Sequence, residues 1–453
     1  MVEHITEIIS KITSVTEWIM LFLIIGGGVF LVCYSGFKPY RYGKHALKVV
    51  SGTLDKNKVE GEITHFQALS SVIAATVGLG NISGVAIAIY YGGPGVVFWM
   101  WITALIGACI KFYSCSLSIF YRKKEKDGTV YGGPMYYMTL GLKFGKPFAI
   151  LFCVAGLIGM LPAFTANQLT QTLMEVIQPN RYIAIGDFYW KCAIGFLLVL
   201  ITSFVIFGGL KKIAEVASLL VPFMVVIYFI AAIVIISTNT SQLLPSLALI
   251  FKEAFNINTA VQGGLWALII LGVRRAVFSN ESGVGSAPMY HGQSKTDEPV
   301  QEGLVGMLGP FIDTLIVCTV TAIVIIISGE YLQTGNNGII MTLRAFEQLL
   351  FGFGGELLML LVIVFGISTL FTYSYYGTKC LGFLAGNKTG KYYNYLYILS
   401  IIFAAIASVD LVIGLIDLGF AFMSIPNMIA ILILAPKVNA AMKSYFKKLH
   451  EKT

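Results

Sequence analysis

Residues 76–84 read Thr-Val-Gly-Leu-Gly-Asn-Ile-Ser-Gly, and residues 278–285 read Phe-Ser-Asn-Glu-Ser-Gly-Val-Gly. Each stretch interrupts a long apolar run with glycine and polar residues, at comparable places in the two halves of the chain. Lipid cannot hydrogen-bond an open N–H or C=O group, so non-helical backbone survives in a bilayer only where it lines a cavity or is buried in protein. A pair of glycine-interrupted spans in the two halves of a chain indicates the binding site of a secondary transporter.

The composition is that of an integral membrane protein. Of the 453 residues, 57% are hydrophobic and only 12% are charged, against about 25% charged in soluble proteins. No charged residue occurs from 66 to 110, a stretch long enough to cross a bilayer twice at roughly 20 residues per crossing. The net charge of +8 is therefore assigned to loops rather than to nucleic-acid binding. The seven cysteines lie mostly in apolar runs, which favours packing over disulfide bonds.

Hydropathy predicts an all-α integral membrane fold with eleven transmembrane helices, near 16–36, 66–90, 95–120, 149–176, 189–209, 213–237, 260–288, 303–328, 355–384, 393–409 and 411–435. Each interrupted span opens a group of five, which gives one N-terminal helix and a 5+5 arrangement. An odd number of helices per repeat makes the second repeat inverted relative to the first. The expected segments are an N-terminal helix with an interfacial region (1–65), a first repeat (66–237), a second repeat with its preceding loop (238–435) and a basic tail (436–453).

The distribution of Lys and Arg predicts the orientation in the membrane. Of the 31 such residues, 23 fall in loops on one side of the predicted helices and five on the other. Cytoplasmic loops carry the excess of positive charge. We therefore expect a multi-pass protein of the cell membrane, with its N-terminus outside and its C-terminus in the cytoplasm.

Six strings occur in order between about residues 60 and 435: Gly-Leu-Gly-Asn-Ile-Ser-Gly-Val-Ala at 78–86, Gly-Gly-Pro-Gly at 92–95 with Phe-Trp-Met-Trp at 98–101, Gly-Gly-Pro-Met-Tyr-Tyr at 132–137, the second interruption extended to Ser-Ala-Pro at 288, Phe-Ile-Asp-Thr at 311–314 and Ser-Tyr-Tyr-Gly at 374–377. Together they resemble the alanine/glycine:cation symporters (sodium:alanine symporter type) of the amino acid–polyamine–cation superfamily. The resemblance implies a leucine-transporter-like fold with two discontinuous helices. It also implies symport of a small neutral amino acid, alanine or glycine first, with Na⁺ or H⁺.

The first interruption suits an amino acid as the ligand. A zwitterion needs donors for its carboxylate and acceptors for its ammonium group, and the ends of half-helices supply both from the backbone. Glycine lets the backbone approach the ligand closely. We expect the amides around Leu79, Gly80 and Asn81 to bind the carboxylate, whereas small residues for helix packing are the alternative. The residues expected to contact the substrate are Thr76, Gly78, Leu79, Gly80, Asn81, Thr165, Asn167, Phe278, Ser279, Asn280, Glu281 and Gly283.

The second interruption places Glu281 well inside an apolar span. An intramembrane carboxylate is costly and is a functional candidate by default. It could contact the substrate's ammonium group or accept a proton. Alternatively, it caps free N–H groups where the helix resumes. Phe278 is expected to form part of a lid over the substrate.

A site for the coupling ion follows from the resemblance. Na⁺ is a hard ion that takes oxygen ligands. Ser368 and Thr369 match the hydroxyl pair that the superfamily places against the first broken helix, and the resemblance adds the carbonyls of Ala74, Val77 and Phe365. The alternative is that both hydroxyls bond only to their own helical turn. Na⁺ is the expected coupling ion and the only metal, with no organic cofactor.

Further charged residues lie within the spans. Arg275 and Asp417 are expected in the outer halves of their spans, where they would form an extracellular gate; a fixed structural pair or snorkelling to the surface is the alternative. Lys111 and Asp313 are deep enough to pair with each other.

Departures from the family pattern concern the cavity. The family's Gln-Ala-Asn string reads Thr-Ala-Asn at 165–167, and the Trp before the Ser-Tyr-Tyr-Gly string is Tyr373. Replacing Gln by Thr enlarges or dries part of the cavity, so another small amino acid remains open as the substrate.

Other functions have weaker support. The sequence contains no G-x-x-x-x-G-K-[ST] motif for an ATP-driven pump. No enzyme is predicted, because the five histidines are scattered outside the spans without the spacing of metal ligands (His4, His45, His65, His291 and His450). An H⁺-coupled transporter and a non-transporting amino-acid sensor remain alternatives. The oligomeric state is left open.

Overall fold

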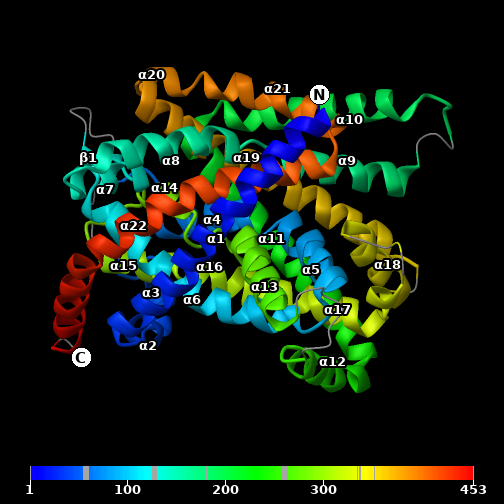
Figure 1. Cartoon of the computed structure of the whole chain (residues 1–453), viewed down its shortest axis with the longest axis horizontal. Coiled ribbons are helices and arrows are strands. Elements are labelled where there is room, and N and C mark those ends of the chain that lie inside the picture. Colours follow the sequence, from blue (N-terminus) through cyan, green and yellow to red (C-terminus); the bar gives the residue numbers. More distant parts are fainter. Residues whose placement is uncertain are drawn as a thin grey trace.

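The computed structural model describes residues 2–54, 61–124, 130–178, 182–256, 264–333, 335, 338–350 and 352–451. This part of the chain forms a bundle of helices with one short antiparallel ribbon, in which β1 (Lys123–Lys124) pairs with β2 (Val130–Tyr131). Helices α1 (Val2–Ser35) and α22 (Val409–His450) pack side by side, as do α10 (Asp187–Ile206) and α21 (Tyr393–Ile406) at the top of Figure 1. The first and last helices of the chain therefore lie against each other.

The remaining helices follow the order expected from the sequence. Between α1 and the first broken span lie α2 (Lys38–Arg41) and α3 (Gly43–Val50), where an interfacial helix is predicted. The first half then contains α4 (His65–Thr76), η1 (Gly80–Gly84), α5 (Val85–Gly92), α6 (Val96–Phe120), α7 (Pro134–Gly141), α8 (Gly145–Gly159), α9 (Ala163–Ile177), α10 and α11 (Gly209–Thr238). The second half contains α12 (Thr240–Glu253), α13 (Gly264–Asn280), α14 (Ala287–His291), α15 (Pro299–Gly306), α16 (Leu308–Pro310), η3 (Phe311–Cys318), α17 (Thr319–Ser328), η4 (Glu330–Leu332), α18 (Ile339–Leu349), α19 (Gly354–Ala385), α20 (Asn387–Gly390), α21 and α22.

Both predicted interruptions are present. Helix α4 ends at Thr76, Val77 takes an extended conformation with ψ 94°, and the chain bends by 51° before it continues as η1 and α5. Helix α13 ends at Asn280, and the chain then passes through positive φ at Glu281 (52°), Gly283 (88°) and Gly285 (95°) before α14 begins. Two of these three positive-φ positions are glycines, the residue for which this conformation costs least, so the glycines of the second string allow the chain to stay non-helical between α13 and α14.

The number of membrane-crossing helices depends on how short and bent helices are counted. Within the described residues, eight helical stretches are long and apolar enough to cross a membrane, or nine if α4 with η1 and α5 forms one span. The two predicted spans that fall below this length are α13, with 17 residues, and α21, with 14. Helix α13 is short because it stops at the second break, and the start of its predicted span, 260–263, lies outside the described residues. The predicted total of eleven therefore stays a prediction.

Two helices differ from their predicted extents. The fourth predicted span is divided at 160–162 into α8 and α9, where Pro162 precedes the first residue of α9. The last span continues as helix to His450, beyond the predicted boundary at 435. The extension packs on the segment after α1, where the rings of Tyr42 and Phe446 stack with centroids 3.7 Å apart. This contact supports helix in a basic stretch whose composition alone suggests a tail.

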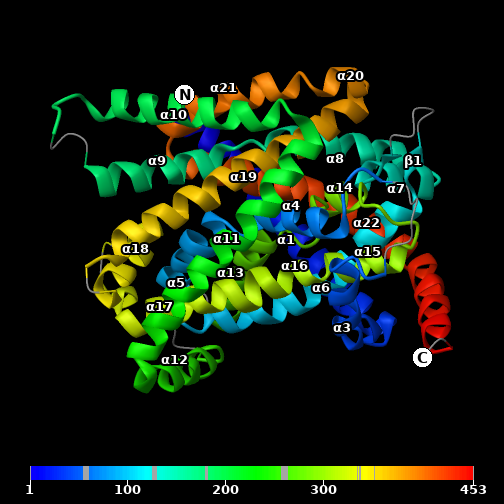
Figure 2. The ribbon, with the colours of Figure 1, turned by 180° about the vertical axis from the view of Figure 1, so that it is seen from behind.

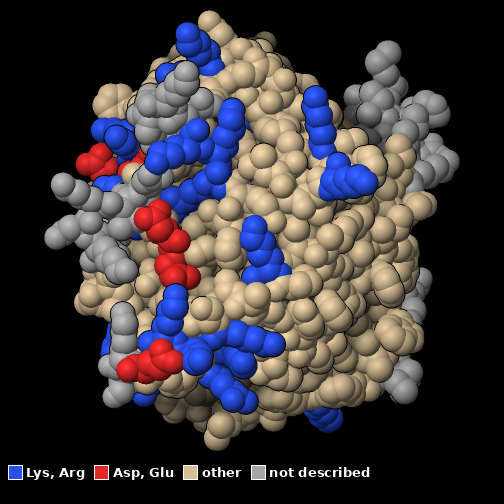
Figure 3. Space-filling view, turned by 90° about the vertical axis from the view of Figure 1, so that its left-hand side faces the viewer, with Lys and Arg blue, Asp and Glu red and all other residues tan. Residues whose placement is uncertain are grey.

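Basic residues gather on one face of the molecule. Figure 3 shows many Lys and Arg side chains and few acidic ones on the side that lies at the left of Figure 1, where α22 ends and where α3 and β1 lie. Figure 2 shows the same end from behind, with α12 and α18 toward the opposite end. The ends of α22, α3 and β1 therefore lie at a face rich in basic side chains.

Candidate functional site

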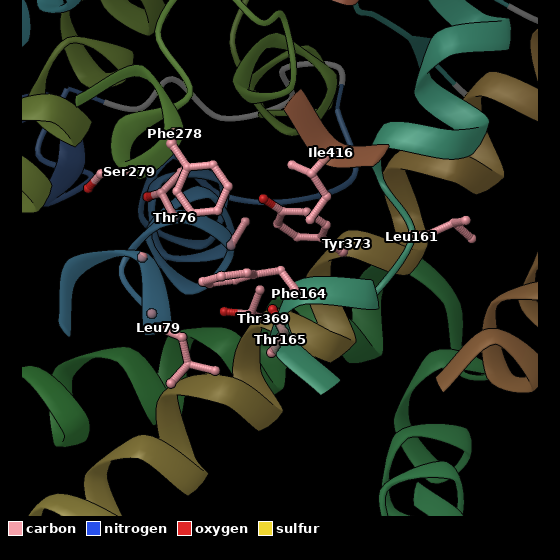
Figure 4. A pocket seen from close by; sticks show the side chains of 13 residues that line it. Thr76, Leu79, Leu161, Phe164, Thr165, Phe278, Ser279, Thr369, Tyr373 and Ile416 are labelled. Atoms are coloured by element: carbon pink, nitrogen blue, oxygen red, sulfur yellow. The ribbon is translucent and has the colours of Figure 1, made fainter. Parts of the chain in front are cut away.

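A small cavity of about 30 Å³ lies where the first break meets the end of α13. Its walls come from both broken helices, from the junction of α8 and α9, and from α19 and α22: Ala75, Thr76, Gly78, Leu79, Gly80, Leu161, Phe164, Thr165, Phe278, Ser279, Thr369, Tyr373 and Ile416. Figure 4 shows the rings of Phe278 and Phe164 and the side chains of Thr76 and Tyr373 around this space. The cavity is thus bounded by elements far apart in the sequence.

The first break is held open by the side chain of Asn81. Its Oδ1 accepts a hydrogen bond from the Gly78 amide at 3.0 Å, and its Nδ2 donates to the Asp313 carboxylate at 2.7 Å and to the Asp313 carbonyl at 3.1 Å. Asn81 is fully buried and does not line the cavity. The amides of Leu79 and Gly80 begin a new helix and have no acceptor one turn earlier. Backbone donors are therefore concentrated at the cavity wall.

The second break is anchored to the same carboxylate. The Ser279 hydroxyl donates to Asp313 at 2.7 Å, and Asn280 Nδ2 donates to the Thr314 hydroxyl at 3.0 Å. Asp313 on η3 therefore contacts Asn81 from the first break and Ser279 from the second. A single buried acceptor joins the two interruptions.

Glu281 lies behind the cavity rather than in its wall. Its carboxylate accepts hydrogen bonds from the hydroxyls of Ser286 and Tyr373. These bonds help hold Glu281 at φ 52°, a conformation that costs a non-glycine residue of order 1–3 kcal/mol. Hydroxyl groups therefore donate to this carboxylate, whereas a role for Glu281 as a helix cap would require backbone N–H donors. Tyr373 lines the cavity and links it to this carboxylate.

Lys111 lies near Glu281 and Asp313 but forms no ion pair with either among the described residues. Its side chain is 1% exposed, interacts electrostatically with Glu281 and Asp313, and packs against Gly309. Within the described part of the chain, its Nζ has no hydrogen-bond partner. The expected Lys111–Asp313 contact is thus an electrostatic interaction over a distance, because Asp313 already accepts bonds from Asn81, Ser279 and Thr314.

Four of the five residues expected to bind the cation meet beside the cavity through their oxygen atoms. Thr369 Oγ1 lies 3.0 Å and Ser368 Oγ 3.4 Å from the Ala74 carbonyl on α4. Both hydroxyls also bond to the Phe365 carbonyl of their own helix, at 3.1 and 2.8 Å. Val77 follows directly where α4 ends. The Ser368 hydroxyl also contacts Met224 Sδ at 3.7 Å, but the hydroxyl and carbonyl oxygens of this cluster are the ligands that suit a hard monovalent ion such as Na⁺.

Aromatic rings and opposite charges close the other side of the cavity. The rings of Phe278 and Phe164 meet edge to face with centroids 5.0 Å apart. The Arg275 guanidinium lies 6.0 Å from the centroid of the Phe278 ring and interacts electrostatically with Asp417. Of the two proposed gate charges, Arg275 therefore lies beside the ring predicted to cover the substrate, and Asp417 interacts with Arg275.

Seven of the residues predicted to contact the substrate line the cavity: Thr76, Gly78, Leu79, Gly80, Thr165, Phe278 and Ser279. Five do not, namely Asn81, Asn167, Asn280, Glu281 and Gly283. The Asn167 amide instead donates to the carbonyls of Ala404 and Ala407 at 3.1 and 2.8 Å, and the Gly283 carbonyl accepts from Asn427 at 2.7 Å. The sequence interpretation missed Ala75, Leu161, Phe164, Tyr373 and Ile416, although it noted Tyr373 as a departure from the family pattern.

Two broken apolar helices around a small cavity, with a hydroxyl–carbonyl cluster beside it, define a membrane transporter of the discontinuous-helix class. A model of the sodium:alanine symporter family matches residues 2–453. The sodium/alanine symporter AgcS of Methanococcus maripaludis is 36% identical over 451 residues, covering 97% of each chain. The probable sodium/glutamine symporter GlnT of Bacillus subtilis is 35% identical, covering 98% of this chain and 92% of that protein.

The chain therefore belongs to the sodium:alanine symporter family, a family of transporters rather than enzymes. Among solved structures, MhsT in complex with L-phenylalanine has a TM-score of 0.58 at 13% identity, over 84% of this chain and 98% of that one. This similarity confirms the leucine-transporter-like fold predicted from the sequence.

Proposed function

We propose that this protein imports a small neutral amino acid, alanine or glycine first, by symport with Na⁺. The observation that carries the proposal is that Gly78 borders both the cavity and the hydroxyl–carbonyl cluster. It lines the cavity, and a Cβ placed on it would lie 2.8 Å from Thr369 Oγ1 in the hydroxyl–carbonyl cluster. An ion in that cluster would touch the same turn of backbone that faces the substrate. Family membership supports Na⁺ coupling and amino-acid transport as the general activity.

The cavity favours a short side chain on the substrate. The substrate carboxylate is assigned to the free amides of Leu79 and Gly80, where the half-helix dipole attracts an anion. Phe164, Phe278 and Ile416 then leave little volume beyond the α-carbon. GlnT of Bacillus subtilis is named a probable sodium/glutamine symporter, and a glutamine-sized ligand would need these rings to move.

Alternating access is assigned to the two ends of the broken helices. The basic face of Figure 3 is placed in the cytoplasm by the positive-inside rule, which puts the C-terminus inside and the N-terminus outside. Arg275 and Asp417 then lie on the extracellular side of the cavity and would draw together when Phe278 covers the substrate. Cysteines at positions 275 and 417 should cross-link faster with Na⁺ and alanine than without; failure to cross-link in any condition would exclude this gate.

The test is uptake into proteoliposomes with the Na⁺ gradient and the pH gradient imposed separately. A panel of labelled amino acids should show concentrative uptake of alanine or glycine under a Na⁺ gradient alone, with little uptake of glutamine. Uptake driven only by the pH gradient would support the H⁺-coupled alternative. Saturable binding without flux would support the amino-acid sensor.

A further inference from the structure

A buried cluster away from the cavity joins the two broken helices to a third element. The Glu302 carboxylate of α15 bonds to His65 Nδ1 through one oxygen and, at 2.5 Å, to His291 Nδ1 through the other. The three side chains are at most 2% exposed. His65 is the first residue of α4, and His291 is the last residue of α14. We call these three residues the histidine–glutamate cluster.

The backbone ties the same two ends together. The amides of Glu62 and Ile63 donate to the Gln293 carbonyl at 2.8 and 3.3 Å, and the Lys295 amide donates to the Ile63 carbonyl at 2.8 Å. Helices α14 and α15 lie toward the left of Figure 1, the side of the basic face. If the substrate site opens toward that side by separation of the first residues of α4 from the last residues of α14, the cluster lies at a contact that has to break.

The bonding pattern makes this cluster able to bind a proton. An ionised carboxylate only accepts hydrogen bonds, so each Nδ1 must carry a hydrogen and each neutral ring has Nε2 as its remaining basic nitrogen. His291 Nε2 is buried and has no hydrogen-bond partner among the described residues. With both rings neutral, the cluster buries one negative charge. One added proton neutralises this charge and turns the hydrogen bond between that ring and the carboxylate into an ion pair.

Other titratable groups lie on the neighbouring elements. Cys115 of α6 interacts electrostatically with Glu302. The others are His45 and Lys48 of α3, Tyr445 of α22, and Glu62, Arg122 and Lys295 of the connecting segments. Arg122 donates to the carbonyls of Ser294 and Thr296 at 2.8 and 2.7 Å. His45 forms a separate pair with Tyr445 at 2.6 Å, and burial together with the charge of Lys48 lowers the pKa of His45. His45 therefore stays neutral at pH values where an ordinary histidine gains charge.

We propose that the histidine–glutamate cluster is a proton-binding site that holds the cytoplasmic ends of the two broken helices together. The inference rests on the proposed function, because it concerns the opening of the same substrate site. Protonation strengthens the closed contact, and loss of the proton favours opening. A proton bound about tenfold more tightly in the closed state than in the open one shifts the equilibrium between them by up to about tenfold.

The experiment compares the protein with its His65→Gln/His291→Gln variant, which keeps an N–H donor at each position but cannot take up the proton. Initial Na⁺-driven alanine uptake is measured with the internal pH at about 6 or about 8, the range in which histidine titrates, and with the external pH fixed. The unaltered protein should slow by up to about tenfold at the acidic internal pH, and the variant should lose most of this dependence. The matched control His45→Gln should retain it. Equal pH dependence in all three proteins would overturn the proposal.

A second measurement does not require transport. A cavity of about 510 Å³ is lined by Glu62, Tyr375 and Thr378, beside the paired backbone segments. With the more accessible Cys33 and Cys192 replaced by serine, a Thr378→Cys reporter can be labelled by a maleimide. Comparing labelling rates with and without the two His→Gln changes at one pH cancels the pH dependence of the thiol itself.

The reporter should be protected several-fold by the histidines at about pH 6 and little at about pH 8. An equal ratio at both values would overturn the cluster's role even if uptake is normal. A pH-dependent ratio in a protein without Na⁺-driven uptake would instead leave the cluster intact and refute the proposed function. If the double variant does not fold, His291→Gln alone gives the same comparison.

Discussion

Replacing Asn81 with alanine would test how the first break supports binding. The change removes four hydrogen bonds: one from the Gly78 amide at 3.0 Å, two donated to Asp313 at 2.7 and 3.1 Å, and one donated to Cys318 Sγ at 3.3 Å. It leaves the Gly78 N–H and one Asp313 oxygen short of a partner in a site without solvent exposure. Both effects act at the turn that faces the cavity.

The size of the effect follows from those orphaned groups. A buried polar group left without its partner costs about 1–3 kcal/mol, and more if it is charged, so two such groups cost roughly 2–6 kcal/mol. Part of this loss will appear as lower stability. The rest should weaken substrate binding, because the amides of Leu79 and Gly80 lose the anchor that fixes their direction. A share of only about 1.4 kcal/mol reduces affinity tenfold.

Asn439→Ala is the matched control. Asn439 is also a buried amide, which accepts from the Tyr113 hydroxyl at 2.6 Å and donates to the Tyr34 carbonyl at 2.9 Å, but it does not contact the cavity. Thermal unfolding in detergent should show both variants destabilised. Alanine binding and uptake per folded protein should fall at least about tenfold only for Asn81→Ala. Equal affinities in the two variants would refute the role given to the first break.

Three further substitutions test neighbouring parts of the site. At Gly80 an added Cβ would lie 3.6 Å from the Phe278 ring, so Gly80→Ala should fold but bind the substrate weakly. The larger change Gly80→Val should abolish uptake while leaving folded protein. Near-normal uptake by the valine variant would refute the assignment of the substrate carboxylate to this turn. Ser368→Ala combined with Thr369→Ala should eliminate Na⁺ stimulation, and a retained Na⁺ response would show that the ion binds elsewhere. Glu281→Gln should lower the stability of the protein by about 1.5–3 kcal/mol, because one of its two hydroxyl donors loses a charged acceptor. If the substrate affinity and the pH response of uptake stay unchanged in this variant, Glu281 has a structural role only.

The sequence predicts the breaks and the ion cluster because both leave local marks. Glycines that alternate with polar residues in an apolar run can mark a backbone that leaves the helix, and Gly283 and Gly285 both have positive φ. The Ser368–Thr369 pair is marked by its place in the family pattern, because adjacent side chains on a helix lie about 100° apart and helical geometry alone does not bring them together. The sequence does not show which way a polar side chain points when its helix packs against two different neighbours. Asn167 could point toward the cavity or toward α21, and it points toward α21 because its amide donates to the carbonyls at the end of that helix.

Contacts between residues far apart in the sequence could not be predicted, because they depend on how the helices pack. His65 and Glu302 are 237 positions apart, and no spacing rule connects them with His291. Each histidine considered alone resembles a loop residue beside a span. Only the packing of α4, α14 and α15 brings the three together. The Lys111–Asp313 pair was inferred from depth in the membrane, which places two residues in one layer but does not say which partner a carboxylate prefers.

The arrangement around Gly78 offers a physical basis for coupling between ion and substrate. Its amide is held by Asn81, its α-carbon adjoins Thr369 Oγ1, and its backbone forms part of the cavity wall. An ion that draws the Ala74 carbonyl and Thr369 Oγ1 together would fix the end of α4, and this fixes the direction of the amides that follow. Asp313 transmits the same constraint to Ser279 on the second broken helix. Ion binding would thereby remove part of the ordering cost that the substrate otherwise bears, and by linkage the substrate must strengthen ion binding by the same factor.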